Sequence, residues 1–315
     1  MKTVYLHIGT HKTGTTTLQH FLSRASTALK DQGVLYPEAG RSSRLPYAHY
    51  NLAWAVRKMR GVTSTNAWSE VLSEIEDWDG EGAVLSSEDF WPCTSEEIQE
   101  ITRFLADQRV EVILYVRNPV DYILSCYKQH LLSAGHKSLE VYMAESVDRV
   151  DYLSAATSWK SDPGVDALHI RPFDKVKGTK FGLERDFIDR VGLDFEPLRR
   201  FGGPSVNVSP ADDVLQVVRL VSRVEDLLIR RIGREREVAA IAKRLRRQLY
   251  DQTWIGGLLT RALRPFLYDD IKEATSPETW DWFRGEIVDQ HRAFLQKFVD
   301  AEDREYLELR RAYPA

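Results

Sequence analysis

The sequence contains only two cysteines, Cys93 and Cys126, among its 315 residues. This number excludes a disulfide framework, and it leaves too few thiolates for a cysteine zinc cluster. Sparse use of cysteine is typical of proteins in a reducing compartment. We therefore expect a cytoplasmic protein.

Long apolar runs are also missing from the sequence. None approaches the roughly 18 residues that a membrane-spanning helix requires. The apolar stretch from Val4 to Ile8 is too short for a signal peptide, and it runs directly into a motif. The sequence therefore predicts no transmembrane segment.

An excess of positive charge is absent as well, since 43 Lys and Arg residues stand against 47 Asp and Glu residues, for a net charge of -4. A general basic field for nucleic acid is therefore not indicated. Hydrophobic residues at 43% and charged residues at 29% are ordinary for a globular protein and exclude disorder as the dominant state. A folded chain of this length buries roughly 75% of its unfolded surface, so it needs no metal or disulfide to fold.

Short β-branched runs alternate with amphipathic stretches over the first 175 residues. The expected strands are Val4–Ile8, Ala83–Ser86, Val112–Val116 and Ala167–Ile170, with Gly33–Tyr36 as a further candidate. Helices are expected at residues 15–29, from the capping box of Thr94 and Glu97 to about residue 107, and from Pro119 onward. Strands separated by helices predict an α/β fold with a three-layer parallel sheet.

The pattern changes after about residue 205, where no strand is indicated. Ser209–Pro210 and Ser276–Pro277 read as the N-cap and first residue of long helices. The apolar face of the second helix is expected to consist of Trp282, Phe283, Ile287, Phe294 and Phe298. The sequence thus predicts a core at residues 1–205 and a helical extension at residues 206–315 that packs on it.

The strongest motif follows the first strand and opens the first helix, which is where phosphate-binding loops lie. Gly9 and Gly14 keep the Gly-x-x-x-x-Gly spacing of a Walker A motif. Its lysine is missing, because Thr15 follows Gly14 and the loop's lysine is Lys12. In P-loop NTPases the lysine reaches the β- and γ-phosphates. A lysine inside the loop therefore predicts a shorter chain of anionic groups, bound by backbone N–H groups and a helix N-terminus.

The run His-Ile-Gly-x-x-Lys-Thr-Gly-Thr-Thr from His7 resembles the 5′-phosphosulfate loop of sulfotransferases that use 3′-phosphoadenosine 5′-phosphosulfate (PAPS). The resemblance implies a P-loop NTPase-like topology, with Lys12 on the 5′-phosphate and on the oxygen that bridges to sulfur. His11 stands where many relatives have proline and is interpreted as a loop residue without a chemical role. The other donor-binding residues implied by the resemblance are Thr13, Gly14, Thr15, Thr16 and Thr17.

A second motif, Arg117-Asn118-Pro119 followed by Ser125 and Tyr127, ends the strand at Val112–Val116. It resembles the 3′-phosphate site of the same family, with Arg117 and Ser125 as ligands. A phosphate dianion is well matched by a forked charged partner and a hydroxyl donor. Asn207 lies where relatives close a loop over the nucleotide, and we expect it to contact the donor. No metal is expected, because no Walker B pair accompanies the loop.

Transfer of a sulfuryl group to an alcohol needs a general base near the attacking oxygen. Glu88 directly follows the strand Ala83–Ser86, so it is expected at the same sheet edge as Lys12. The resemblance supports a glutamate such as Glu88 as the base, because glycan-modifying sulfotransferases often use a glutamate in this role. Asp89 is an alternative. His49 is another, as a base or as an acceptor contact, because histidine titrates near neutral pH.

The acceptor is expected to be a hydroxyl group of a sugar, polysaccharide or glycolipid. The Arg-Lys-Gly-x-x-Gly motif of small-molecule cytosolic sulfotransferases is absent, which argues against steroid and phenol acceptors. One alternative is a P-loop nucleotide or small-molecule kinase, which Thr15 in place of lysine disfavours. The other is a non-catalytic glycan- or nucleotide-binding protein of the same fold.

A basic run extends from Arg219 to Arg247, with ten Lys and Arg residues against four acids. Such a run can bind an anionic polysaccharide or the headgroups of a membrane surface. It is also typical of the solvated face of a long helix. The sequence leaves these alternatives open.

Overall fold

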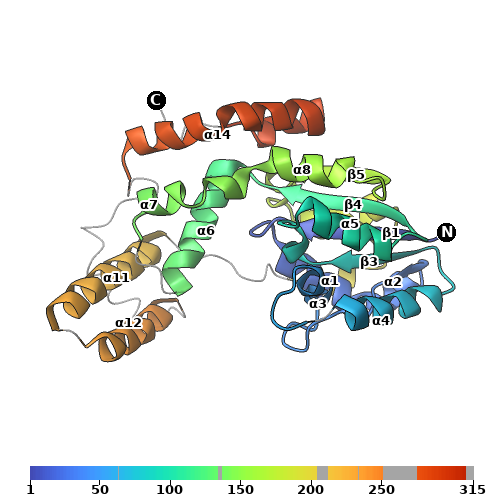
Figure 1. The fold of residues 1–315 in the computed structure, drawn as a ribbon, viewed down its shortest axis with the longest axis horizontal. Helices are drawn as coiled ribbons and strands as arrows, with labels where there is room; N and C mark the ends of the chain where they lie inside the picture. Colours follow the sequence, from blue (N-terminus) through green and yellow to red (C-terminus); the bar gives the residue numbers. More distant parts are fainter. Residues whose placement is uncertain (63, 134–136, 204–211, 233, 251–274, 310–315) are drawn as a thin grey trace. The chain divides into compact units, whose positions relative to one another are not determined.

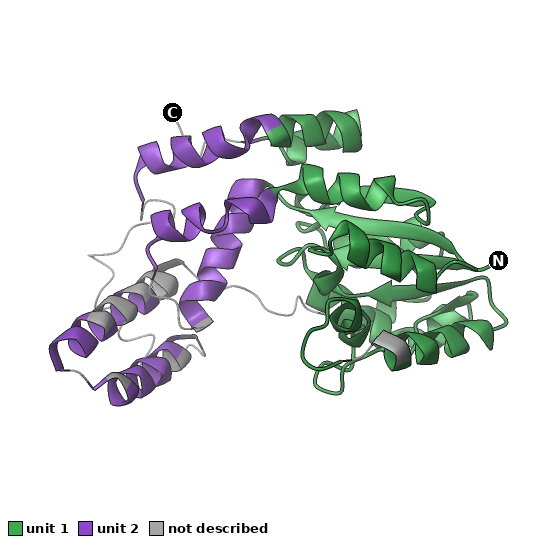
Figure 2. Ribbon diagram, viewed as in Figure 1, with its two compact units in different colours: residues 1–118, 151–207, 290–308 green, residues 119–150, 208–289, 309–315 purple. Residues whose placement is uncertain are grey.

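The computed structural model describes residues 1–62, 64–133, 137–203, 212–232, 234–250 and 275–309. The chain divides into two compact units, each of which is discontinuous in sequence (Figure 2). The first unit consists of residues 1–118, 151–207 and 290–308, and the second of residues 119–150, 208–289 and 309–315. The division into residues 1–205 and 206–315 stays a prediction.

The first unit is built on a five-stranded parallel sheet in the order β2-β3-β1-β4-β5 (Figure 1). The strands are β1 (Thr3–Gly9), β2 (Val34–Leu35), β3 (Gly82–Ser86), β4 (Arg109–Val116) and β5 (Ala167–Pro172). These are the strands that the sequence predicts. Since β1 is central, the carboxyl ends of β3 and β4 flank its own, and ligands of open parallel sheets bind at this edge.

Helices flank the sheet of the first unit and make it an α/β structure. They are α1 (Thr15–Arg24), α2 (Ser26–Lys30), α3 (Tyr50–Val56), α4 (Ser64–Glu76), α5 (Ser95–Phe104), α8 (Tyr152–Ser161), α9 (Phe173–Val176) and α10 (Gly182–Val191), with 3-10 turns η1 (Glu88–Phe90), η3 (Arg199–Phe201) and η6 (Ala301–Tyr306). The capping box of Thr94 and Glu97 opens α5 as predicted. The single helix expected at residues 15–29 is interrupted, because Ala25 has ψ 2° and separates α1 from α2.

Alternation along the buried strands explains the layers, because successive side chains point to opposite faces of a sheet. Ile113 and Tyr115 of β4 pack with Leu18 and Phe21 of α1 and with Phe187 of α10 in one core. Helices α5 and α8 contact each other, and Figure 1 shows them together across the sheet from α1. The fold is therefore the three-layer α/β arrangement that the sequence predicts.

The second unit is helical over its described residues. Its elements are α6 (Pro119–Ser133), α7 (Leu139–Ala144), η2 (Val147–Val150), α11 (Asp212–Ile232), α12 (Glu235–Tyr250) and the first part of α14 (Pro277–Phe298). The predicted helix starts at Pro119 and Pro277 are confirmed, whereas Ser209 and Pro210 lie outside the described residues. No helix in the described part of the chain is long and apolar enough to cross a membrane.

The predicted apolar face of α14 is wrong at one position. Trp282 is 42% exposed, whereas Trp280, Phe283, Ile287 and Phe294 are fully buried. Trp280 lies three residues before Phe283 and therefore on the same side of the helix, while Trp282 is turned about 100° away from Phe283. The buried tryptophan of this face is thus Trp280.

Candidate active site

The segment between β1 and α1 forms a tight loop with three left-handed residues. Gly9, Lys12 and Gly14 have φ angles of 79°, 66° and 73°. This conformation is easy for glycine but costs roughly 1–2 kcal/mol for a residue with a side chain. Residues held in such strained conformations cluster at ligand-binding and active sites. The backbone of Lys12 is therefore held by its surroundings in a shape that suits a binding loop.

One hydrogen bond joins this loop to the sheet, and a second one closes the loop internally. The backbone N–H of Thr10 donates to the carbonyl of Tyr115 in β4 over 2.8 Å, and the Thr13 hydroxyl donates to the carbonyl of Thr10 over 2.6 Å. The loop is thus fixed to the carboxyl end of the neighbouring strand.

Helix α1 begins directly after the loop. No side chain caps the N-terminus of this helix, and its first turn carries no acidic residue. The first N–H groups of a helix lack intrahelical partners and carry partial positive charge. Thr15 and Thr17 are buried in this first turn, and Thr16 is half-buried. Lys12, the helix N-terminus and these hydroxyls together can hold an anion.

Glu88 touches the loop, as the sequence predicts from its place after a strand. Ser86 of β3 pairs with His7 of β1, and the next N–H, that of Ser87, donates to the carbonyl of His7 over 3.0 Å. A Cβ atom built on Gly9 would lie 2.7 Å from the Cβ atom of Glu88. The first glycine of the loop and the carboxylate residue are therefore in direct contact.

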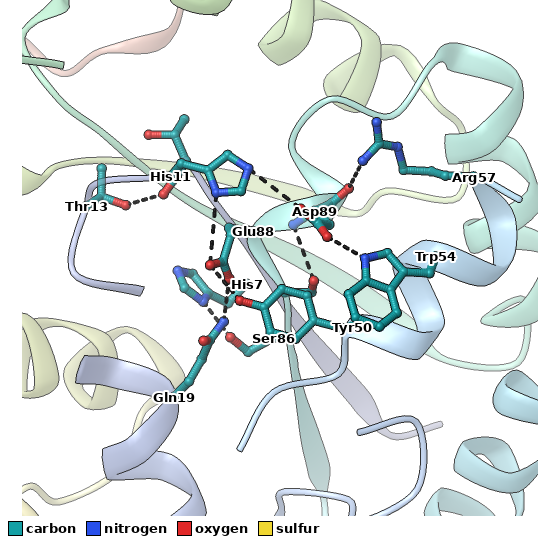
Figure 3. A network of polar contacts seen from close by, with 12 residues as sticks. His7, His11, Thr13, Gln19, Tyr50, Trp54, Arg57, Ser86, Glu88 and Asp89 are labelled. Atoms are coloured by element: carbon teal, nitrogen blue, oxygen red, sulfur yellow. Dashed lines mark hydrogen bonds and ion pairs between the residues drawn. The ribbon is translucent and has the colours of Figure 1, made fainter. Parts of the chain in front are cut away.

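The Glu88 carboxylate is 7% exposed and is oriented by two donors (Figure 3). Oε1 accepts from the Tyr50 hydroxyl over 2.7 Å, and Oε2 accepts from Gln19 Nε2 over 2.8 Å. Burial, with the charge of Glu88 beside it, raises the pKa of Tyr50 far above its ordinary value. Tyr50 therefore keeps its proton and remains a donor to the carboxylate.

Asp89 and His11 extend this network toward solvent (Figure 3). The Asp89 carboxylate accepts from Trp54 Nε1 over 2.6 Å. The His11 imidazole lies between the two acids, with Nδ1 4.0 Å from Glu88 Oε1 and Nε2 3.6 Å from Asp89 Oδ1, and its side chain is 45% exposed. The sequence assigned His11 no chemical role, but the structure brings it to both candidate acids.

His49 has a different environment. It is fully buried before α3, where Nδ1 accepts the Ser86 N–H over 3.1 Å and Nε2 lies 3.0 Å from the carbonyl of Pro37. Since Nδ1 is an acceptor, Nε2 carries the hydrogen and donates it to that carbonyl. Burial lowers the pKa of His49 to about 3. Both ring nitrogens are therefore used to join backbone segments.

Arg117 directly follows β4, and its guanidinium group can still donate a hydrogen bond. Its Nε atom is buried without a hydrogen-bond partner and lies 3.6 Å from Asp174 Oδ1. Its guanidinium carbon lies 5.9 Å from the ring centre of Phe173. Ser125 is on α6 and belongs to the second unit, and Asn207 lies outside the described residues. A 3′-phosphate site that joins Arg117, Ser125 and Asn207 stays a prediction.

A cavity of about 910 Å³ adjoins the loop at Gly14 and Thr17. The rest of its wall comes from Phe173, residues 176–184, Gly202 and Gly203. A Cβ atom on Gly14 would lie 2.7 Å from Leu183 Cδ2 and 3.1 Å from Phe173 Cε2, so the wall packs directly on the loop. The cavity can hold an organic group attached to an anion in the loop, and Lys177 and Lys180 are among its lining residues.

Three residues of this site have no assigned role in the sequence prediction: His11, Gln19 and Tyr50. Gln19 is fully buried and lies one helical turn after Thr15, which is the one local sign of its position beside the loop. Tyr50 reaches Glu88 from 38 positions away, and no local pattern indicates that contact. Among the described residues, no group of three or more His, Cys, Asp or Glu side chains is arranged to hold a metal ion.

Comparison with known proteins gives one family. The family model described as "Sulfotransferase domain" matches residues 3–161, just over half of the chain. A protein of Archaeoglobus fulgidus described as uncharacterized is 24% identical over 152 residues, which cover 48% of this chain and 38% of that protein. No solved structure matches the chain. The matched range contains the loop of Lys12, the carboxylates at 88 and 89, and Arg117.

Proposed function

Since the chain belongs to the sulfotransferase domain family, we propose that it transfers the sulfuryl group of PAPS to an acceptor hydroxyl. The products are adenosine 3′,5′-bisphosphate and a sulfate ester. The observation that carries this proposal is the direct contact of Gly9 with Glu88, which joins the proposed anion-binding loop after β1 to a buried carboxylate after the neighbouring strand β3. A reaction between an anionic donor and a hydroxyl group needs these two parts side by side.

The donor is assigned to the loop and the cavity. Lys12 and the N–H groups and hydroxyls of residues 13–17 hold the phosphosulfate, and the cavity at Gly14 holds the nucleoside. Arg117 takes the 3′-phosphate, together with Ser125 and Asn207. The buried Nε atom of Arg117, which has no hydrogen-bond partner, supports this assignment because a phosphate oxygen would provide one.

In the transfer step, the acceptor oxygen attacks sulfur as the bond between sulfur and the bridging oxygen breaks. Lys12 stabilises the charge that develops on the leaving phosphate. Glu88 removes the hydroxyl proton of the acceptor. Tyr50 and Gln19 keep the carboxylate in one orientation, so that it does not have to be positioned anew in each turnover. The step needs no metal ion.

Glu88 is a better base than its two competitors in this geometry. His49 has neither ring nitrogen available to a substrate. The carboxylate of Asp89 already accepts from the Trp54 indole and faces His11, so we assign it the role of positioning these two rings. The proton that Glu88 takes up can leave toward solvent by way of the half-exposed His11.

We assign the acceptor to the carbohydrates or glycolipids. Support comes from the half-buried rings of His20 and Tyr47 near Glu88, which pack in a tilted arrangement with ring centres 3.9 Å apart. Burial and the charge of Glu88 raise the pKa of Tyr47, so this ring lies close enough to interact electrostatically with the carboxylate. Rings with one polar tip pack well against sugar faces.

Nucleotide binding and product mass test this function. Titration calorimetry should give much tighter binding for adenosine 3′,5′-bisphosphate than for adenosine 5′-phosphate, because the second phosphate adds a charged contact. Incubation with PAPS and a panel of glycans and glycolipids should give products heavier by one sulfuryl group, in the presence of a chelator. Equal affinity for the two nucleotides contradicts the donor, and activity with ATP that needs added magnesium indicates a kinase.

A further inference from the structure

Helices α11 and α12 of the second unit form a hairpin and lie side by side in Figure 1. Val217, Val218, Ala242 and Leu249 are buried in this unit. Arg246 of α12 donates to the Glu225 carboxylate of α11, and both side chains are almost fully buried. This ion pair connects the two helices. Separating the helices would leave each buried charge without its partner, which is strongly unfavourable.

The hairpin exposes an unusual amount of apolar surface. Of the nine large apolar side chains that are exposed among the described residues, six lie on these two helices. They are Leu220 (40% exposed), Val224 (46%), Leu227 (65%), Leu228 (39%), Ile232 (54%) and Ile241 (64%). Single exposed apolar residues are ordinary, but a concentration of them marks a surface that binds something.

Between the helices this surface is hollowed into an apolar groove of about 240 Å³. Glu225 is its one charged lining residue, and that carboxylate is already neutralised by Arg246. The other lining residues are Leu220, Val221, Val224 and Leu228 from α11, and Val238, Ile241, Ala242 and Leu245 from α12. The groove therefore offers contact for an apolar chain and almost no polar partner.

Basic side chains surround the apolar surface. Among the side chains that the structure describes within residues 212–250, the exposed charged ones are six basic and one acidic. The basic ones are Arg230, Arg231, Arg234, Arg236, Lys243 and Arg244, and the acidic one is Glu237. The whole chain has a net charge of -4, so this is a local concentration of positive charge.

We propose that the hairpin of α11 and α12 binds the surface of a membrane that contains anionic lipids. The exposed leucines and isoleucines enter the boundary between headgroups and acyl chains, and the arginines pair with lipid phosphates. An anionic polysaccharide would match the arginines but would leave the apolar side chains in water. A symmetric second copy would cover the apolar side chains but would bring arginines against arginines. The proposal is independent of the sulfotransferase activity.

Co-sedimentation of the full-length protein with vesicles tests this surface. The protein should sediment with vesicles of phosphatidylcholine and phosphatidylglycerol, and not with phosphatidylcholine alone. Binding should weaken as salt screens the headgroups. The double variant Arg231→Glu/Arg234→Glu should bind the anionic vesicles less tightly by roughly fivefold or more for each arginine changed. The double variant Leu227→Ser/Ile241→Ser should also bind less tightly, because it removes apolar contact without changing charge.

The matched control variants carry the same kinds of substitution at exposed positions outside this surface. Val141 on α7 is 48% exposed, and the Arg199 side chain is 57% exposed. Val141→Ser and Arg199→Glu should leave vesicle binding unchanged. Thermal unfolding and circular dichroism show which variants are folded, and only folded variants are compared.

Several outcomes would overturn the proposal. One is an unchanged protein that does not bind anionic vesicles even at low salt. Another is undiminished binding by both double variants. Heparin binding that depends on the arginines but not on Leu227 and Ile241, without vesicle binding, would identify a polysaccharide site. A dimer in sedimentation velocity that only Leu227→Ser/Ile241→Ser dissociates would identify a second copy as the occupant.

Discussion

Gly9 leaves no room for a side chain against Glu88, because a Cβ atom there would lie 2.7 Å from Glu88 Cβ and 3.0 Å from Glu88 Cα. Gly9 also has φ 79°, where residues with a side chain are strained. Glycine at this position therefore serves two purposes, since it turns the loop and lets the carboxylate residue approach it. The distance between the donor loop and the proposed base is thus fixed by backbone packing.

Gly9→Ala should lower both stability and turnover. The added methyl group has to displace the backbone of Glu88, in addition to the cost of the left-handed conformation. Gly192→Ala is the matched control, because Gly192 has φ 81° but nothing within 4 Å of the position of its Cβ atom. We expect the control to lose roughly 1–2 kcal/mol of unfolding free energy, and Gly9→Ala to lose more and to be inactive. Urea unfolding and PAPS turnover measure both, and an active Gly9→Ala protein would contradict the packing role.

Lys12→Ala should lower kcat by roughly 10²–10³, which is typical for loss of one preorganised stabiliser of developing charge. The affinity for adenosine 3′,5′-bisphosphate should fall much less, because the lysine matters most as the bridging oxygen becomes anionic. Lys180→Ala is the comparison, since Lys180 lines the proposed nucleoside cavity. It should weaken nucleotide binding and leave kcat nearly unchanged. Near-normal turnover of Lys12→Ala would remove Lys12 from the mechanism.

Glu88→Gln should lower turnover by roughly 10²–10⁴, the usual contribution of a positioned base, without weakening nucleotide binding. Tyr50→Phe removes one hydrogen bond to the carboxylate and leaves the base in place. It should therefore retain more activity than Glu88→Gln. The measurement is kcat at saturating PAPS and acceptor. A nearly active Glu88→Gln protein beside an inactive Asp89→Asn protein would transfer the role of base to Asp89.

Stability should fall as the pH decreases below about 6.5, in part because of His7 and His49. Burial lowers the pKa of each from 6.5 to about 3, so both stay neutral in the folded protein and become protonated on unfolding. The unfolded state therefore binds more protons between these pKa values, and each histidine lowers stability by about 1.4 kcal/mol per pH unit there. His7→Gln should remove one such contribution. Urea unfolding at several pH values checks this, and equal pH slopes for His7→Gln and the unchanged protein would contradict it.

The tight loop between β1 and α1 could be predicted from the sequence because its determinants are local. Strand, two glycines, lysine and helix start follow one another within residues 3–24. The position of Glu88 beside this loop could be predicted as well, because the carboxyl ends of parallel strands meet at one edge. Both predictions use the order of elements and need no knowledge of side-chain packing.

The partners of Glu88 could not be predicted in this way. Gln19 and Tyr50 lie 69 and 38 positions from it, and the loops between them have no periodic pattern that sets their path. The environment of His49 is a similar case, since its bonds to Pro37 and Ser86 depend on how residues 37–49 fold over the sheet. Periodicity also failed to find the break at Ala25, because the apolar spacing continues across it.

The side chains of Leu183 and Phe173 pack directly against Gly14, the second glycine of the loop. Both residues lie beyond residues 3–161, the range that the family model matches. The same is true of β5, which pairs along β4. Farther along the chain, Asp303 pairs with Arg171 and Lys175 within the same unit. A recombinant fragment trimmed to residues 3–161 would thus expose one edge of β4 and remove the wall of the loop. Any shortened form made for crystallisation has to keep residues 162–203 and 290–308, although the family match ends well before them.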